Sequence, residues 1–291
     1  MTLQSHTPWS RRLTPAKVLI YLVLIAVLVV TAYPFFYVLF MSVMPYENYV
    51  KSSIHALPSG FTATYFQQIL QDTRLTGAYE VSILKTAAGT LLSVIVTVMG
   101  GYALSRTQLK YGRFLTVLFL IPLFTNSGLI PAYLNFQSLG LLNTFWVLIL
   151  PGVAAPFNLF IARTFFSDFP QELIEAATID GASQFGIFWR VVWPTSTPII
   201  ATLAMLYGVA HWNEYFWPSI LVQSNLQPAS VLLQNIVANR SVLQGLGLGI
   251  QMAPQSFIAA VAALLIIPVL VAYPFVQRYV VTGILLGSVK G

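Results

Sequence analysis

Long apolar runs are the feature that most constrains what this chain of 291 residues can fold into. A helix needs roughly 20 apolar residues to cross the hydrocarbon core of a bilayer. Six runs meet that length and predict membrane-spanning helices at residues 18–43, 82–104, 114–135, 144–165, 196–220 and 254–280. Because the runs are continuously apolar, helices are favoured over the alternating segments of a barrel. We therefore expect an all-α membrane protein with six transmembrane helices.

The composition agrees with a lipid environment. Hydrophobic residues make up 57% of the chain and charged residues 8%, whereas soluble domains carry about 25% charged residues. Because cysteine is absent, disulfides, thiolate metal sites and thiol nucleophiles are excluded. The net charge of +6 is not gathered into a basic run of the kind that binds nucleic acid, so no nucleic-acid partner is expected.

The positions of the basic residues predict the orientation in the membrane. With the N-terminus inside, ten of the 14 basic residues fall on cytoplasmic segments, namely Arg11, Arg12, Lys17, Arg106, Lys110, Arg113, Arg163, Arg190, Arg278 and Lys290. The positive-inside rule then places both termini in the cytoplasm. The expected organisation is a cytoplasmic segment at 1–17, a transmembrane domain at 18–281 and a cytoplasmic tail at 282–291. Lys85, at the start of the second span, is expected to snorkel to the interface.

A cytoplasmic loop at residues 166–194 connects the fourth and fifth predicted spans. Ser167 or Asp168 can cap a first short helix, and Gly181 can end it in a left-handed conformation. A second short helix is expected from Ser183 to Trp193, ending at Pro194. That helix is rich in aromatic residues, and an apolar patch exposed to water usually marks a binding site. From the residues alone, a protein partner and the lipid interface both remain open as its binding surface.

The spacing in this loop resembles the EAA loop of bacterial ABC importer permeases. Glu-Ala-Ala at 175–177 is followed after three residues by Gly181 and after nine more by Val-Val-Trp-Pro at 191–194. The family pattern ends in Ile-x-Leu-Pro, so Val191 and Trp193 depart from it. The resemblance implies that the first helix inserts into a cleft on an ATPase subunit, where Glu175 meets a basic residue. It assigns ATPase coupling to Glu172, Glu175, Ala176, Ala177, Asp180, Gly181, Val191 and Pro194.

Three segments, one of them within this loop, resemble the carbohydrate branch of this family, to which the smaller maltose-importer permease belongs. They are Tyr-Ala-Leu-Ser-Arg at 102–106, Glu-Ala-Ala-Thr-Ile-Asp-Gly-Ala-Ser at 175–183 and Gly-Ser-Val-Lys-Gly at 287–291. The last of these and His-Trp-Asn-Glu at 211–214 are similar to permeases for complex or acidic oligosaccharides, including an alginate importer.

The resemblance also implies the partners. It implies a type I importer in the bacterial inner membrane, with a second and different permease subunit, two ATPase subunits and a soluble substrate-binding protein probed by the outer loop at 221–253. The tail residues Lys290 and Gly291 would reach the interface between the ATPases. ATP and Mg would be bound by the partner subunits. This chain itself has no phosphate-cradling Gly-x4-Gly-Lys-Ser/Thr loop, so we expect no catalytic site, cofactor or metal in it.

Ionisable residues inside the predicted fifth span are candidates for contact with cargo, because charged groups in a bilayer usually have a partner or a function. The candidates are His211, Trp212, Asn213, Glu214 and Tyr215. His211 and Glu214 are spaced i, i+3 and could pair. Either they fix helix packing, or they line the translocation pathway, where Trp212 or Tyr215 would stack on a sugar ring.

Asn126 is a further candidate for the pathway. It begins Asn-Ser-Gly at 126–128, between Pro122 and Pro131, which indicates a kink in the third span. Such a kink can face a cavity or serve ordinary helix packing. Asn158 in the fourth span is expected to be a packing residue.

The function predicted is a permease subunit that moves a sugar or oligosaccharide into the cytoplasm by alternating access. An ABC permease for a non-sugar solute, a secondary transporter driven by an ion gradient and a membrane scaffold are the alternatives. A secondary transporter would need ion- or proton-carrying groups near the membrane midplane, and Glu214, the one strong acidic candidate, is poor support for it. A scaffold would leave the loop at 166–194 unexplained.

Overall fold

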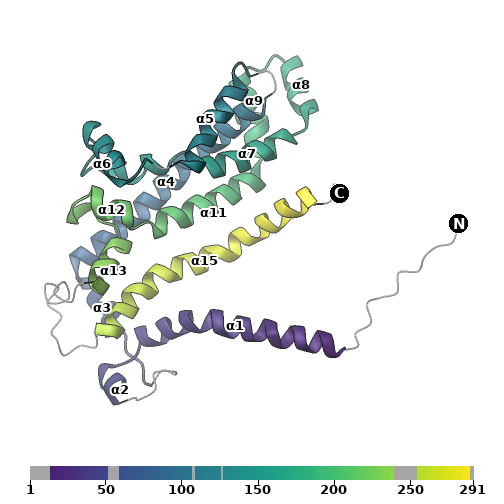
Figure 1. Cartoon of the computed structure of the whole chain (residues 1–291). Helices are drawn as coiled ribbons and strands as arrows, with labels where there is room; N and C mark the ends of the chain where they lie inside the picture. The colour runs from purple at the N-terminus through teal and green to yellow at the C-terminus, as the bar shows by residue number, and fades with distance from the viewer. Residues whose placement is uncertain (1–13, 52–58, 107–108, 126, 239–253, 289–291) are drawn as a thin grey trace. The chain divides into compact units, whose positions relative to one another are not determined.

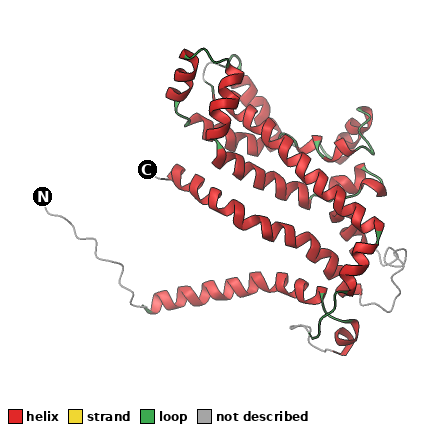
Figure 2. Cartoon of the chain, turned by 180° about the vertical axis from the view of Figure 1, so that it is seen from behind, coloured by secondary structure: helices red, strands yellow, loops and turns green. Residues whose placement is uncertain are grey.

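The computed structural model describes residues 14–51, 59–106, 109–125, 127–238 and 254–288. Within these ranges the chain consists of helices and connecting loops, without strands, as Figure 2 shows. The predicted all-α fold is therefore confirmed for the described residues. The longer helices are α1 (Pro15–Ser42), α4 (Thr73–Ser105), α5 (Gly112–Phe124), α6 (Leu129–Ser138), α7 (Pro156–Ser167), α11 (Thr197–Asn213), α13 (Ala229–Ala238) and α15 (Pro254–Ser288).

The chain divides into two compact units, residues 1–65 with 250–263 and residues 66–249 with 264–291. The first unit contains α1, α2 (Tyr46–Lys51) and the start of α15, up to residue 263. Helix α1 begins after Thr14, whose side chain accepts from the Lys17 N–H. It is apolar on every side and exposes its side chains along most of its length, as expected of a helix that faces lipid or another protein. Met41, Met44 and Ala259 form a small core in this unit.

Helix α4 organises the second unit and packs against both α7 and α11 (Figure 1). Its N-terminus is capped by the Asp72 carboxylate, which accepts from two backbone N–H groups. The buried face of α4 is a stripe of polar and small residues at three- or four-residue spacing, made of Ser82, Lys85, Gly89, Ser93, Thr97 and Gly101. Large apolar residues such as Leu84 and Leu91 lie on its exposed face. This inverted pattern suits a helix surrounded by lipid, because polar side chains must then find partners inside the protein.

Several of the predicted spans are broken. Among the described residues three helical segments are long and apolar enough to cross a membrane, namely Pro15–Ser42, Thr73–Ser105 and Gln255–Ala272. The count rises to five if each bent pair is one span: Phe145–Gly152 with Pro156–Ser167 at 50°, and Gln184–Thr195 with Thr197–Asn213 at 81°. The predicted six spans are therefore not confirmed.

Two breaks can be located at single residues. The run at 114–135 forms α5 and α6, which are separated near Gly128, a residue with φ of 81°. The predicted kink is therefore present, although Asn126 lies outside the described residues. The run at 196–220 ends as a helix at Asn213, where Glu214 adopts extended backbone before α12 (Phe216–Leu221).

Close packing of α4 on α7 gives a direct test of the fold. A Cβ added at Gly101 would lie 2.5 Å from the Ala162 Cβ, whereas one added at Gly77, also in α4, meets nothing within 4 Å. Alanine stabilises an exposed helical glycine position by about 1 kcal/mol, but overpacking costs about 1–3 kcal/mol. We expect Gly101→Ala to lower the thermal unfolding midpoint in detergent and Gly77→Ala to leave it unchanged or raise it. Equal midpoints for the two variants would contradict the packing described.

Candidate functional site

Lys85 is wholly buried in the second unit and joins α4 to the end of α11. Its Nζ donates to the backbone carbonyl of Glu214 at 3.2 Å, and the same carbonyl accepts from Ser230 Oγ at 2.8 Å. Carbonyl groups at a helix C-terminus carry partial negative charge and favour a nearby cation. The expectation that Lys85 snorkels to the interface was wrong, because its face of α4 is covered by other segments of the unit.

Two polar pairs join α4 to α11. His211 Nε2 lies 3.3 Å from Ser93 Oγ, and its ring occupies the space next to Gly89, where a Cβ would approach Nε2 to 2.8 Å. One turn earlier on α11, the Tyr207 hydroxyl lies 2.6 Å from Thr97 Oγ1. The same hydroxyl accepts from the Ala155 N–H at 3.2 Å. Gly89 thus supplies the space that the His211 ring needs.

Glu214 caps the next helix. Its Oε1 accepts from the Trp217 N–H at 3.1 Å, at the start of α12. The i, i+3 spacing to His211 allowed a pairing of the two side chains. Glu214 has left the helical register after Asn213, however, and each of the two side chains has the hydrogen-bond partner given above.

A cavity of about 300 Å³ lies beside these contacts, among the short turns at Phe145–Leu148 and Leu150–Gly152 and the helices α7, α11 and α12. Its polar lining comes from Asn158, Tyr207, His211 and Glu214. We call this space the polar cavity. It offers an amide, a phenol, an imidazole and a carboxylate, which are groups that can hydrogen-bond a polar ligand.

The polar cavity is lined by two of the predicted cargo residues and by two residues that were not among them. His211 and Glu214 were expected there, whereas Asn158 was expected to be a packing residue. Tyr207 was overlooked, although its position one helical turn before His211 would have revealed it.

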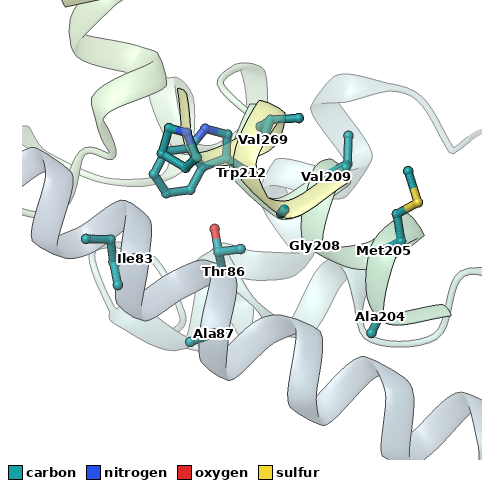
Figure 3. A pocket seen from close by; sticks show the side chains of 11 residues that line it. Ile83, Thr86, Ala87, Ala204, Met205, Gly208, Val209, Trp212 and Val269 are labelled. Carbon is teal, nitrogen blue, oxygen red and sulfur yellow. The ribbon is translucent and has the colours of Figure 1, made fainter. Parts of the chain in front are cut away.

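The other predicted residues lie elsewhere. Trp212 Nε1 donates to the Leu265 carbonyl at 2.8 Å, and its ring lines a second, apolar cavity of about 430 Å³. Figure 3 shows Ile83 and Thr86 of α4 on one side of this space and Trp212 on the other. Asn213 and Tyr215 are exposed. The predicted fifth-span set is therefore divided between separate environments.

The loop at 166–194 begins with α8 (Gln171–Ile179). Pro170 occupies the N-cap position without a side-chain cap, and α7 continues to Ser167, so the predicted capping by Ser167 or Asp168 was wrong. The predicted ending is confirmed: Gly181 has φ of 79°. Its N–H donates to the Thr178 carbonyl at 3.0 Å, and the Ala182 N–H donates to the Ala177 carbonyl at 3.0 Å. These two bonds form a Schellman motif.

Helix α8 has an inner and an outer face. Ile174 is buried, and Ala177 packs against the same core, so only one of the two adjacent alanines is exposed. Ile179 is 85% exposed, an unusual state for isoleucine. We use the name outer face of α8 for five of its exposed residues, Glu172, Leu173, Glu175, Ala176 and Ile179. Asp180, Gly181 and Pro194 are exposed as well, and Val191 is partly buried.

The second helical segment of the loop is a continuous run of α9 (Gln184–Ile187), a π-helical turn (Phe188–Val192) and α10 (Trp193–Thr195). Pro194 therefore does not end the helix, which continues to Thr195. Phe188 and Val192 are buried in the core, while Phe185 is 66% exposed. The aromatic patch expected at the surface is thus partly core, because Phe188 and Val192 belong to the cluster that also contains Tyr102 and Phe166.

The tail residues predicted to reach the interface between the ATPases, Lys290 and Gly291, lie outside the described residues. The described residues contain no group of three or more histidine, aspartate or glutamate side chains that could hold a metal ion.

Three similarities place the chain among known proteins. It is 34% identical to Protein LplC of Bacillus subtilis (strain 168), over 90% of each chain. It is 35% identical to the polygalacturonan/rhamnogalacturonan transport system permease protein YtcP of the same organism, over 94% of this chain and 97% of the relative. A crystal structure of a bacterial ABC transporter involved in the import of the acidic polysaccharide alginate matches with a TM-score of 0.84 and 27% identity. That match covers 94% of this chain and 99% of the other.

The family assignment rests on nearly the whole length of the chain. Residues 13–285 match the family described as "Binding-protein-dependent transport system inner membrane component". The apolar helices of the described residues agree with a multi-pass protein of the inner membrane. The chain therefore belongs to the family of inner-membrane components of binding-protein-dependent transport systems.

Proposed function

We propose that this chain is a permease subunit of an ATP-driven importer for an oligosaccharide, and that the outer face of α8 is its docking surface for an ATPase subunit. The observation that carries the proposal is the exposure of Glu175, Ala176 and Ile179 on a short helix anchored to the core by Ile174. An exposed isoleucine beside acidic residues costs solubility unless a partner covers it. The same residues lie in the segment that resembles the EAA loop.

The assembly proposed contains a second permease subunit, two ATPase subunits that bind ATP and Mg, and a soluble substrate-binding protein. Both termini are proposed to lie in the cytoplasm, on the same side as α8. In this arrangement, movement of the ATPases would displace α8 and alter the helices around the polar cavity. Cargo would then reach the cytoplasm by alternating access, because a cavity that opens to each side in turn never forms a continuous leak.

The polar cavity is proposed to contact the cargo. Amide, phenol and imidazole groups suit sugar hydroxyls, which both donate and accept hydrogen bonds. Two relatives point to acidic sugars, since their names refer to polygalacturonan and to the acidic polysaccharide alginate. Glu214 would repel a uronate if it were unpaired, but its carboxylate accepts a backbone N–H, and its carbonyl accepts from the buried Lys85. An acidic oligosaccharide is therefore the first cargo to test.

The docking proposal predicts that charge reversal on the outer face of α8 uncouples the importer. In liposomes containing the assembled complex, Glu175→Lys is expected to lower ATP-dependent uptake by about tenfold or more, the scale of a lost charge-assisted contact. Glu80→Lys is the matched control, because Glu80 is also exposed but lies near the N-terminus of α4. Normal assembly and uptake with Glu175→Lys would overturn the docking surface. Uptake by this chain alone, driven by a proton or sodium gradient, would overturn the whole proposal.

The cargo proposal predicts a change in affinity when the cavity loses an amide. Asn158→Leu keeps a similar volume but removes the hydrogen-bonding group, so we expect the KM for oligosaccharide uptake to rise by about tenfold. Met205→Leu, in the apolar cavity, should leave the KM unchanged. Oligogalacturonate, alginate oligosaccharide and a neutral maltooligosaccharide are compared in the same assay. An unchanged KM for every cargo with Asn158→Leu would contradict a role for the polar cavity.

A further inference from the structure

Arg106 joins the C-terminal end of α4 to the first turn of α8. It is the C-cap residue of α4, and its Nη1 donates to Gln171 Oε1 at 2.8 Å. Gln171 is the first residue of α8. A hydrogen bond from a guanidinium is directional and about twice as strong as one between neutral groups. The contact therefore links the first turn of α8 directly to the end of α4.

The guanidinium of Arg106 is held in place by the aromatic core of the loop. Its central carbon lies 4.3 Å from the centroid of the Tyr102 ring, one helical turn back on α4. The Tyr102 ring contacts those of Phe166 and Phe188, each at 5.6 Å between centroids. These two rings come from α7 and from the π-helical turn after α9. Arg106 thus makes a cation–π contact with Tyr102. It lies where α4, α7, α8 and the π-helical turn meet.

Two N–H donors of the Arg106 side chain lower the stability of the fold. Within the described residues, Arg106 Nε and Nη2 are buried and have no hydrogen-bond partner. A buried donor without a partner is destabilising, so this arginine is a poor choice for stability alone. An unsatisfied buried group in a folded protein often marks a functional requirement. Lysine could reach for the same amide oxygen without the rigid planar group that stacks on Tyr102.

Helix α4 connects this contact to the polar cavity. Its 33 residues form one helix from Thr73 to Ser105, which corresponds to a length of about 50 Å. Ser93 and Thr97, on its buried face, contact His211 and Tyr207 of the cavity wall. If α8 moves and displaces the end of α4, the stiff helix α4 therefore carries this displacement to the side chains that line the polar cavity.

We propose that Arg106 is the positioning residue that transmits movements of α8 to α4. The inference rests on the proposed function of the outer face of α8 as an ATPase-docking surface. Arg106 itself touches neither cargo nor nucleotide in this account. It acts through Gln171 on one side and through α4 on the other, so its loss is expected to separate ATP hydrolysis from transport rather than to prevent assembly.

The first arm of the test measures the position of α8 directly. The chain has no natural cysteine, so spin labels at Ala103→Cys and Thr178→Cys report only the distance between α4 and α8. In the full chain we expect a narrow distance distribution, which broadens with Arg106→Gln and with Gln171→Ala. The double variant should be no broader than either single one, because both remove the same contact. Lys110→Gln is the control, since Lys110 is an exposed cation between α4 and α5, four residues after Arg106.

The second arm measures cargo molecules taken up per ATP hydrolysed by the reconstituted complex. We expect Arg106→Gln to lower this ratio by about tenfold, on the scale of one charge-assisted hydrogen bond, with ATP hydrolysis and subunit assembly retained. Arg106→Lys, which keeps the charge but not the planar stack, should restore part of the ratio. A merely structural role would lower assembly and hydrolysis together and leave the ratio unchanged.

The outcomes separate the two proposals. If the unsubstituted complex shows no ATP-dependent uptake, the proposed function fails, and the inference that depends on it fails with it. If that complex transports normally and Arg106→Gln matches it in distance distribution or in uptake per ATP, the proposed function stands and the role of Arg106 is overturned.

Discussion

The internal satisfaction of polar groups along α4 is the constraint on which the second unit depends. A polar side chain in a lipid-surrounded helix must find its partner within the protein, because the bilayer core offers none. Lys85 is the most demanding member of the stripe, since a buried ammonium is costly without a partner. It finds one in the Glu214 carbonyl. Ser82 does the same with the Ala229 N–H at 2.8 Å. Together these contacts hold the segments after α11 against α4, while Gly101 lets α7 approach from another side.

The broken helices follow from the same constraint. The end of α11 at Asn213 releases backbone groups that a continuous helix would have used. Lys85, Ser230 and the backbone at Trp217 supply partners for Glu214 at this break. Irregular backbone at membrane depth is tolerated where it is enclosed by protein or lines a cavity. The polar cavity lies at this break, so the feature that weakens the helix also brings hydrogen-bonding groups into the interior.

The sequence could predict features that depend on local chemistry. It indicated helices from continuous apolar runs and a kink between Pro122 and Pro131. It also indicated a helix end at Gly181, because glycine is favoured in left-handed backbone. Features that depend on which helix packs where were not accessible in this way. Lys85 could have snorkelled or turned inward, and only the packing of α11 decides between the two. The position of the Trp212 side chain depends on its hydrogen bond to the Leu265 carbonyl, a contact between residues 53 positions apart. The periodicity of Ser82, Lys85, Gly89, Ser93 and Thr97 was readable as a polar inner face, but it lay within a run read only for its length.

One stiff helix, in this proposal, couples the outer face of α8 to an internal polar cavity. Cysteine accessibility tests it most directly, because the natural chain contains no cysteine to interfere. Ala155 lines the polar cavity and is small, so Ala155→Cys places a thiol there with little disturbance. The measurement is the rate of its reaction with a membrane-impermeant maleimide in the reconstituted complex, without nucleotide and after incubation with ATP and vanadate. The account predicts a several-fold difference between the two rates, which Glu175→Lys abolishes. Equal rates in both states, in a complex that transports cargo, would contradict it.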